Sequence, residues 1–134
     1  HKYLLKTNPN DIHTVLSNAK IYIGDSQSMA VESALLGTPG IRFNDFTNQI
    51  GVLNELEVKY GLTKSIAIMD EEKLYKVVKE MLEMEDLRIL QHEKLKTLLQ
   101  DKINVCDFFV WYIKSYPESK KIHAEQPQFQ YTFQ

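Results

Sequence analysis

The chain has 134 residues, the size of one ordinary domain, and a chain of this length buries about two-thirds of the surface that its unfolded form exposes. Its composition, 43% hydrophobic and 25% charged with a formal net charge of -2, is that of a soluble globular protein and offers no electrostatic footprint for nucleic acid or anionic lipid. The one cysteine, Cys106, excludes an internal disulfide and favours a reducing, cytoplasmic compartment. No apolar run reaches membrane-spanning length, and no Cys, His or carboxylate spacing suggests a metal or a resident cofactor. Because the chain opens at His1 without a methionine, we expect a fragment of a longer protein.

Short β-like runs alternate with helical patterns along the first half of the chain, which predicts parallel βαβ units. The runs are residues 3–6, 21–24, 41–44 and 65–68. A short helix is expected through Ser17, and a second from the turn at residues 25–28 through Leu36. Gly37 suits the left-handed position after that second helix, and Pro39 prevents its continuation. A polar loop at residues 45–49, which includes Thr47, leads to an amphipathic helix that ends near residue 60.

The second half of the chain is predicted to be helical. Two amphipathic helices follow residue 70, and a last helix, residues 105–116, is capped by Asn104 and ended by Pro117. Aromatic residues make that last helix apolar almost all round, so it must be buried or docked. We therefore expect one domain over residues 1–117 and a mobile, aperiodic tail over residues 118–134.

Small polar residues stand where the second β-like run turns into a helix, the place where open parallel sheets bind ligands. The hydroxyls of Ser26 and Ser28, together with the unpaired amides of the first helical turn around Gln27, can hold a phosphate. Glu32 lies one turn behind Ser28 and can accept hydrogen bonds from ribose hydroxyls. The structural alternative, that Ser26 is only a helix cap and Glu32 a solvated residue, stays open.

Three further interpretations concern this turn and the β-like run that follows it. The sequence Gly-Asp-Ser at residues 24–26 is also typical of one class of serine esterases, in which Ser26 would be the nucleophile, but no histidine stands at the required spacing. Past the third β-like run, Asn44 and Asp45 are candidates for the rim of a sugar site. Arg42, inside that run, is expected either to pair with a carboxylate or to face a ligand or partner.

Taken together, residues 10–16, 23–34, 36–39 and 41–46 resemble a bacterial and archaeal family of unknown function that is related to the UDP-N-acetylglucosamine 2-epimerases. The similarity continues through residues 53–62, 101–105 and 109–113 and covers residues 3–119. The resemblance implies the C-terminal half of a glycosyltransferase-B fold, that is, an α/β fold with a partial Rossmann-like parallel sheet followed by C-terminal helices.

The resemblance also implies roles for single residues. It matches Ser26 to the serine that contacts the nucleotide phosphates in the epimerases, and Glu32 to their ribose-binding glutamate. Gln27 and Ser28 replace two glycines of those enzymes. The implied ligand is UDP or a UDP-sugar, and the implied setting is surface polysaccharide or glycolipid synthesis by a sugar-nucleotide epimerase or glycosyltransferase.

An N-terminal half-domain is the partner that this resemblance implies, and without it we expect no catalysis and assign no catalytic residue. In the strand order 3-2-1-4-5-6, the four runs seen here would be the third to sixth strands, and the two missing strands would lie between residues 3–6 and the next run, at the centre of the sheet. An exposed sheet edge, re-pairing of residues 3–6 or dimerisation is therefore expected. The alternative function is a non-catalytic interaction module that docks a partner, or a second copy, through helix 105–116.

Overall fold

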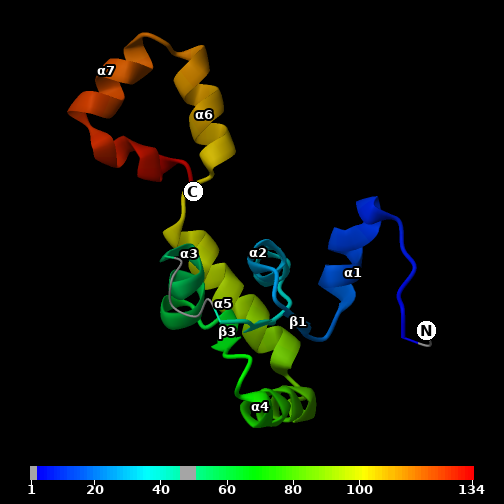
Figure 1. Ribbon diagram of the computed structural model, residues 1–134. Helices are drawn as coiled ribbons and strands as arrows, with labels where there is room; N and C mark the ends of the chain where they lie inside the picture. The colour runs from blue at the N-terminus through cyan, green and yellow to red at the C-terminus, as the bar shows by residue number, and fades with distance from the viewer. Residues whose placement is uncertain (1–2, 46–50) are drawn as a thin grey trace. The chain divides into compact units, whose positions relative to one another are not determined.

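The computed structural model describes residues 3–45 and 51–134, and the chain divides into two compact units, one ending at Leu95 and one beginning at Lys96. Figure 1 shows the helices and strands of each unit. The start at His1 and the expected loop from Phe46 to Gln49, with Thr47, lie outside the described residues. The division at residue 95 differs from the boundary after residue 117 that the sequence suggests.

Helices and strands alternate in the first unit. They are a 3-10 turn (Pro9–Asp11), α1 (Ile12–Asn18), β1 (Tyr22–Gly24), α2 (Gln27–Leu35), β2 (Gly40–Phe43), α3 (Gly51–Asn54), the π-helical turn η2 (Glu55–Lys59), β3 (Thr63–Ile66) and α4 (Glu71–Glu83). Helix α5 (Leu87–Asp101) contains the boundary between the units. The second unit continues with α6 (Val105–Lys114), α7 (Glu118–Glu125) and a 3-10 segment (Pro127–Thr132).

The three strands form a parallel sheet in the order β1-β2-β3. Tyr22 lies opposite Gly40, and Gly40 lies opposite Thr63. This arrangement is the α/β fold predicted from the sequence, consistent with a partial Rossmann-like sheet. The apolar part of its core is formed by Leu16, Ala30, Ala34, Ile41, Leu53, Leu56, Tyr60, Leu62, Ile66 and Leu87.

Two glycines allow α2 to end and to pack closely on the sheet. Gly37 follows the helix with a φ of +79°, the left-handed conformation predicted for it. Gly40 opens β2, where an added Cβ would lie 3.0 Å from Ser33 Oγ and 3.3 Å from the carbonyl oxygen of Ala30. The absence of a side chain at Gly40 therefore allows the backbone of α2 to approach β2 closely.

The expected strand at residues 3–6 is absent, which corrects the sequence prediction. The side chains of Tyr3, Leu4 and Leu5 are 89%, 63% and 64% exposed, and the residues form no strand. A strand needs a hydrogen-bonded neighbour and a face to bury, and among the described residues the sheet ends at β1. The other three predicted strands are confirmed, with ends shifted by one or two residues.

The second unit is organised around α6. As predicted, Asn104 caps this helix: its Oδ1 accepts from the Asp107 amide at 3.2 Å, and its Nδ2 donates to Asp107 Oδ2 at 2.7 Å. Residues 118–134 were expected to be aperiodic but form α7 and the 3-10 segment. The reason is tertiary: buried Ser119 donates to the carbonyl of Tyr112 at 2.6 Å.

Aromatic contacts complete this second core. The ring centroid of Phe129 lies 4.9 Å from that of Trp111, and Phe133 lies 5.4 Å from Trp111 and 5.7 Å from Phe108. The backbone amide of Asn104 donates to the carbonyl of Phe133, which brings the end of the chain back to the start of α6. These contacts join aromatic residues that are not at helical spacing, so the hydrophobic periodicity of the sequence does not predict them.

Candidate functional site

The carboxyl ends of parallel strands meet at one edge of the sheet, and the predicted polar residues lie there. Asn44, just after β2, donates from Nδ2 to the carbonyl oxygen of Asp25 at 3.0 Å, so it ties the loops that follow β1 and β2 together. The structure thus brings Asn44, a predicted rim residue, beside the turn at Ser26. Asn44 is 3% exposed, whereas Asp45 is exposed to solvent at the rim.

The turn into α2 is a capped helix start. Ser26 has extended backbone angles (φ -71°, ψ 118°), and its Oγ accepts from the Met29 amide at 3.4 Å. The hydroxyl proton of Ser26 is not used in that bond. The amides of Gln27 and Ser28 stand in the first turn, where no carbonyl four residues earlier lies within the helix. The turn therefore presents amide donors and the positive end of the helix dipole at the edge where ligands enter.

Glu32 has a partner that the sequence analysis did not assign to it. Its Oε2 lies 3.1 Å from His13 Nε2, which joins α2 to α1. The side chains are 42% and 63% exposed for Glu32 and His13, so the pair is open to solvent. The two residues are 19 positions apart and on different helices, and only their packing places them together. In the described contacts His13 pairs with Glu32 and not with Ser26, so Ser26 has no general base there.

Tyr22 is a second residue that sequence reasoning missed. Its phenol donates to the carbonyl of Ser26 at 3.4 Å, and its ring occupies the space where a Cβ on Gly24 would lie. Burial raises the pKa of Tyr22, and the negative charges of Asp25 and Glu32 raise it further. A signal was present in the sequence, because Tyr22 precedes Gly24 by two residues and therefore shares its face of β1.

Chemically, this edge of the sheet combines two kinds of group. Amides and hydroxyls of Ser26, Gln27 and Ser28 donate hydrogen bonds, which suits a phosphate. The carboxylates of Asp25 and Glu32 accept hydrogen bonds, which suits sugar hydroxyls, but they repel a densely charged anion. The combination fits a ligand that carries both phosphate and hydroxyl groups better than it fits a bare polyanion.

Arg42 resolves an alternative that the sequence left open, because it pairs with a carboxylate. The side chain is 1% exposed, and its Nη2 lies 2.8 Å from Glu57 Oε2, with a further contact to Ser65 Oγ. The other oxygen of Glu57 accepts from the Ser65 amide at 2.8 Å, so the carboxylate covers the backbone of β3. Arg42 Nε and Nη1 are buried without a partner among the described residues. The role of Arg42 is to hold β2, β3 and η2 together.

Within residues 3–45 and 51–134, no group of three or more His, Cys, Asp or Glu residues could hold a metal ion. No helix there has both the length and the apolar character that crossing a membrane requires. Comparison with protein-family models, with curated proteins and with solved structures finds no match for this chain.

Proposed function

We propose that the edge of the sheet after β1 and β2 is a nucleotide-sugar-binding site, the C-terminal part of a glycosyltransferase-B-like protein related to UDP-N-acetylglucosamine 2-epimerase. The observation that carries the proposal is the Ser26-capped start of α2 at the carboxyl edge of a parallel sheet. In open α/β sheets this is the edge at which nucleotides bind. The resemblance of the surrounding residues to the epimerase-related family supports the same ligand class, UDP or a UDP-sugar.

Each residue of the site has a role in this proposal. The amides of Gln27 and Ser28, with the hydroxyls of Ser26 and Ser28, hold the diphosphate. Glu32 accepts from the ribose hydroxyls and is oriented by its 3.1 Å contact with His13. Exposed Asp45 lies at the sugar rim, while Asn44 keeps the two loops together rather than contacting the sugar. Because the residues assigned to the phosphate carry no positive charge, we expect dissociation constants of about 1 mM.

The proposed role of this chain is binding without catalysis, in a pathway that makes surface polysaccharide or glycolipid. No residue of the site is assigned to bond breaking. The catalytic groups would come from an N-terminal half-domain that faces the same edge of the sheet.

The proposal is tested by following backbone amide resonances during titration with UDP and UDP-N-acetylglucosamine. We expect shifts confined to residues 22–32 and 44–45, with uridine, which lacks phosphate, producing much smaller ones. Glu32→Gln should weaken binding about threefold to tenfold, because a neutral amide accepts a weaker hydrogen bond than a carboxylate. Glu72→Gln, on the exposed first turn of α4, is the matched control and should have no effect. Absence of shifts at residues 26–32 at millimolar ligand contradicts the proposal.

A second candidate function, self-association through α6, is favoured by an exposed apolar stripe on that helix. The stripe consists of Val105, Phe109, Val110 and Ile113, which are 49%, 58%, 50% and 73% exposed. At about 100° per residue these four side chains share one side of the helix. The opposite side packs in the aromatic core through residues such as Trp111. The interaction-module hypothesis therefore applies to one side of α6 and not to the whole helix.

The charges beside the stripe favour a second copy of this chain as its occupant. Asp107 and Lys114 are seven residues apart, so they lie on the same flank of the stripe. When two copies of a helix pack antiparallel about a two-fold axis, equal flanks face each other, and each Asp107 meets the partner's Lys114. We expect Ile113→Lys and Lys114→Glu to lower dimer content in analytical ultracentrifugation, and Asp107→Lys with Lys114→Glu to restore it. A chain that stays monomeric at all concentrations excludes this candidate.

A further inference from the structure

The two edges of the sheet in the first unit are protected differently. At the β3 edge, the amide of Ser65 donates to Glu57 Oε1 at 2.8 Å. Thr63 and Ile66 of that strand are only 3% and 1% exposed. Charged caps and covering segments of this kind prevent a sheet edge from pairing with another strand. Among the described residues, β1 forms the other edge and has a neighbouring strand on one side only. The β1 edge is therefore the one that can accept a further strand.

Ile23 is open at this edge through both its backbone and its side chain. The Tyr22 amide donates to the Pro39 carbonyl at 2.9 Å, so the backbone of Tyr22 faces β2. Because successive residues of a strand direct their N–H and C=O groups to opposite sides, those of Ile23 face away from β2. The Ile23 side chain is 45% exposed, whereas Ile41, which lies opposite it in β2, is 0% exposed. The apolar face that is covered at β2 is thus open at β1.

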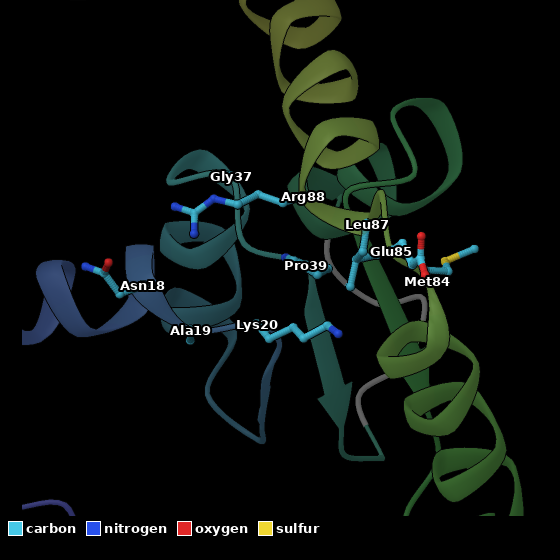
Figure 2. A pocket seen from close by; sticks show the side chains of 9 residues that line it. All are labelled: Asn18, Ala19, Lys20, Gly37, Pro39, Met84, Glu85, Leu87 and Arg88. Carbon is cyan, nitrogen blue, oxygen red and sulfur yellow. The ribbon is translucent and has the colours of Figure 1, made fainter.

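The segment that leads into β1 is anchored, so the edge is already ordered. Figure 2 shows this segment beside the turn that joins α4 to α5, around a cavity of about 290 Å³. Lys20 Nζ donates to the carbonyl of Leu82 at 2.8 Å. Arg88 Nη2 donates to the carbonyl of Ser17 at 2.9 Å. A strand that adds to an ordered edge loses less entropy, because only the incoming segment must be fixed.

Residues 3–6 form an exposed arm whose side chains match this edge. Leu4 is 63% exposed, and Lys6 is also exposed. A parallel pairing with Leu4 opposite Ile23 places two apolar side chains together. In the same register Lys6 lies opposite exposed Asp25, so opposite charges meet. Apolar contact and charge complementarity therefore select the same register.

The turn after the arm leaves it outside the sheet of its own chain. Asn8 Oδ1 accepts from the Asn10 amide at 3.0 Å, and Pro9 begins the 3-10 turn. The proline ring fixes φ, and the cap fixes the residues around it, so the turn is stiff. A stiff turn at the base of an arm favours pairing with another molecule over folding back.

We propose that two copies of this chain exchange their arms, each adding residues 3–6 as a parallel strand at the β1 edge of the other. The Leu5 amide donates to the carbonyl of the partner's Ile23, and Lys6 pairs with the partner's Asp25. A two-fold axis makes the two contacts equivalent, so each bond forms twice in the dimer. This interface is separate from the stripe on α6, and it does not depend on the proposed nucleotide site.

The experiment uses the full chain with Ile113→Lys, which removes association through α6. Analytical ultracentrifugation gives the dissociation constant of the dimer, and amide hydrogen exchange gives the location of the contact. We expect a concentration-dependent dimer with slowed exchange at the amides of Leu5 and Ile23. A chain that is still monomeric at about 1 mM overturns the proposal, as does a dimer in which both amides exchange as fast as in the monomer.

Leu4→Ser tests the apolar contact without disturbing the fold. Because Leu4 is exposed in the single chain, its replacement should leave the free energy of unfolding of the monomer unchanged. The dissociation constant of the dimer should rise about tenfold, since an apolar contact is lost twice. The matched control is Ile89→Ser on α5, where the side chain is 65% exposed, and it should leave the dimer unchanged. Equal dissociation constants for these two variants contradict the proposal.

The charges allow a mixing test that separates exchange between copies from pairing within one chain. Lys6→Asp and Asp25→Lys each bring like charges together, so each variant alone should dimerise about tenfold more weakly. An equimolar mixture of the two should regain the parent affinity, because both contacts of a mixed dimer then join opposite charges. A mixture as weak as the separate variants overturns the exchange. Slowed exchange of Leu5 in a monomeric double variant would then show that the arm pairs with its own β1.

Discussion

The ion pair between Arg42 and Glu57 provides the sharpest test of how the first unit is held together. Glu57→Gln keeps the shape of the side chain and an oxygen that can accept from the Ser65 amide, but it removes the charge opposite the guanidinium. Arg42 is 1% exposed and already has two buried N–H groups without a partner among the described residues. The substitution therefore leaves a buried cation without its counter-ion.

The expected loss is about 2–4 kcal/mol in the free energy of unfolding. Removing one partner of a fully buried pair costs about 3–5 kcal/mol, and the 25% exposure of Glu57 lowers that range because water can partly solvate the site. Replacing both residues, Arg42→Met with Glu57→Gln, should recover most of the loss, since no unpaired charge then remains. The matched control is Glu83→Gln, which removes an exposed pair with Lys79 and should cost less than about 0.5 kcal/mol.

The assay is urea unfolding of the four proteins, followed by far-UV circular dichroism and by amide resonances of residues 21–66. Fluorescence of Trp111 is unsuitable for this purpose, because Trp111 belongs to the second unit. A loss below about 0.5 kcal/mol for Glu57→Gln would refute the reasoning, since the pair would then behave like an ordinary surface pair. A double variant as unstable as the single one would show that packing and not charge is responsible.

Three further predictions concern other elements. The pKa of Tyr22 is raised above its usual value of 10.0, first by burial and then by Asp25, so the phenol ionises at lower pH in the unfolded chain than in the folded one. The free energy of unfolding should therefore fall as the pH rises from about 9 to 11. Urea titrations should show that this free energy falls less for Tyr22→Phe. Asn104→Ala should cost the second unit about 1 kcal/mol through loss of the α6 cap, measured by Trp111 fluorescence during urea unfolding, and unchanged resonances of the first unit serve as control. Gly37→Ala should cost the first unit about 1–2 kcal/mol by circular dichroism, because φ is +79° there; an unchanged midpoint would contradict the strain.

The local features of the fold were predictable because short-range chemistry determines them. Ser26 caps α2 through its own hydroxyl, Gly37 supplies a left-handed residue, and Asn104 with Asp107 forms a cap within four residues. Short hydrophobic runs likewise located three strands, because the residue pattern of a strand is local. The order of these strands along the chain is also their order in the sheet. The helix start at the sheet edge, on which the nucleotide proposal depends, was therefore visible in the sequence.

Features that depend on partners distant in sequence were not predictable. The contact of Glu32 with His13 joins two helices, and the pairing of Arg42 with Glu57 joins β2 to η2; neither follows from spacing along one element. The absence of a strand at residues 3–6 has the same cause, because an apolar run forms a strand only when a neighbouring strand is present to pair with it.

By itself, the sequence determined the α/β class, the helix caps and the polar turn around Ser26, because each depends on residues a few positions apart. Only the tertiary structure decided that Arg42 forms an internal ion pair, that residues 118–134 form helices on an aromatic core, and that Lys20 and Arg88 each donate to a carbonyl near the end of a helix. The physical reason is that burial and charge pairing are properties of surfaces brought together by folding, and they have no period along the chain.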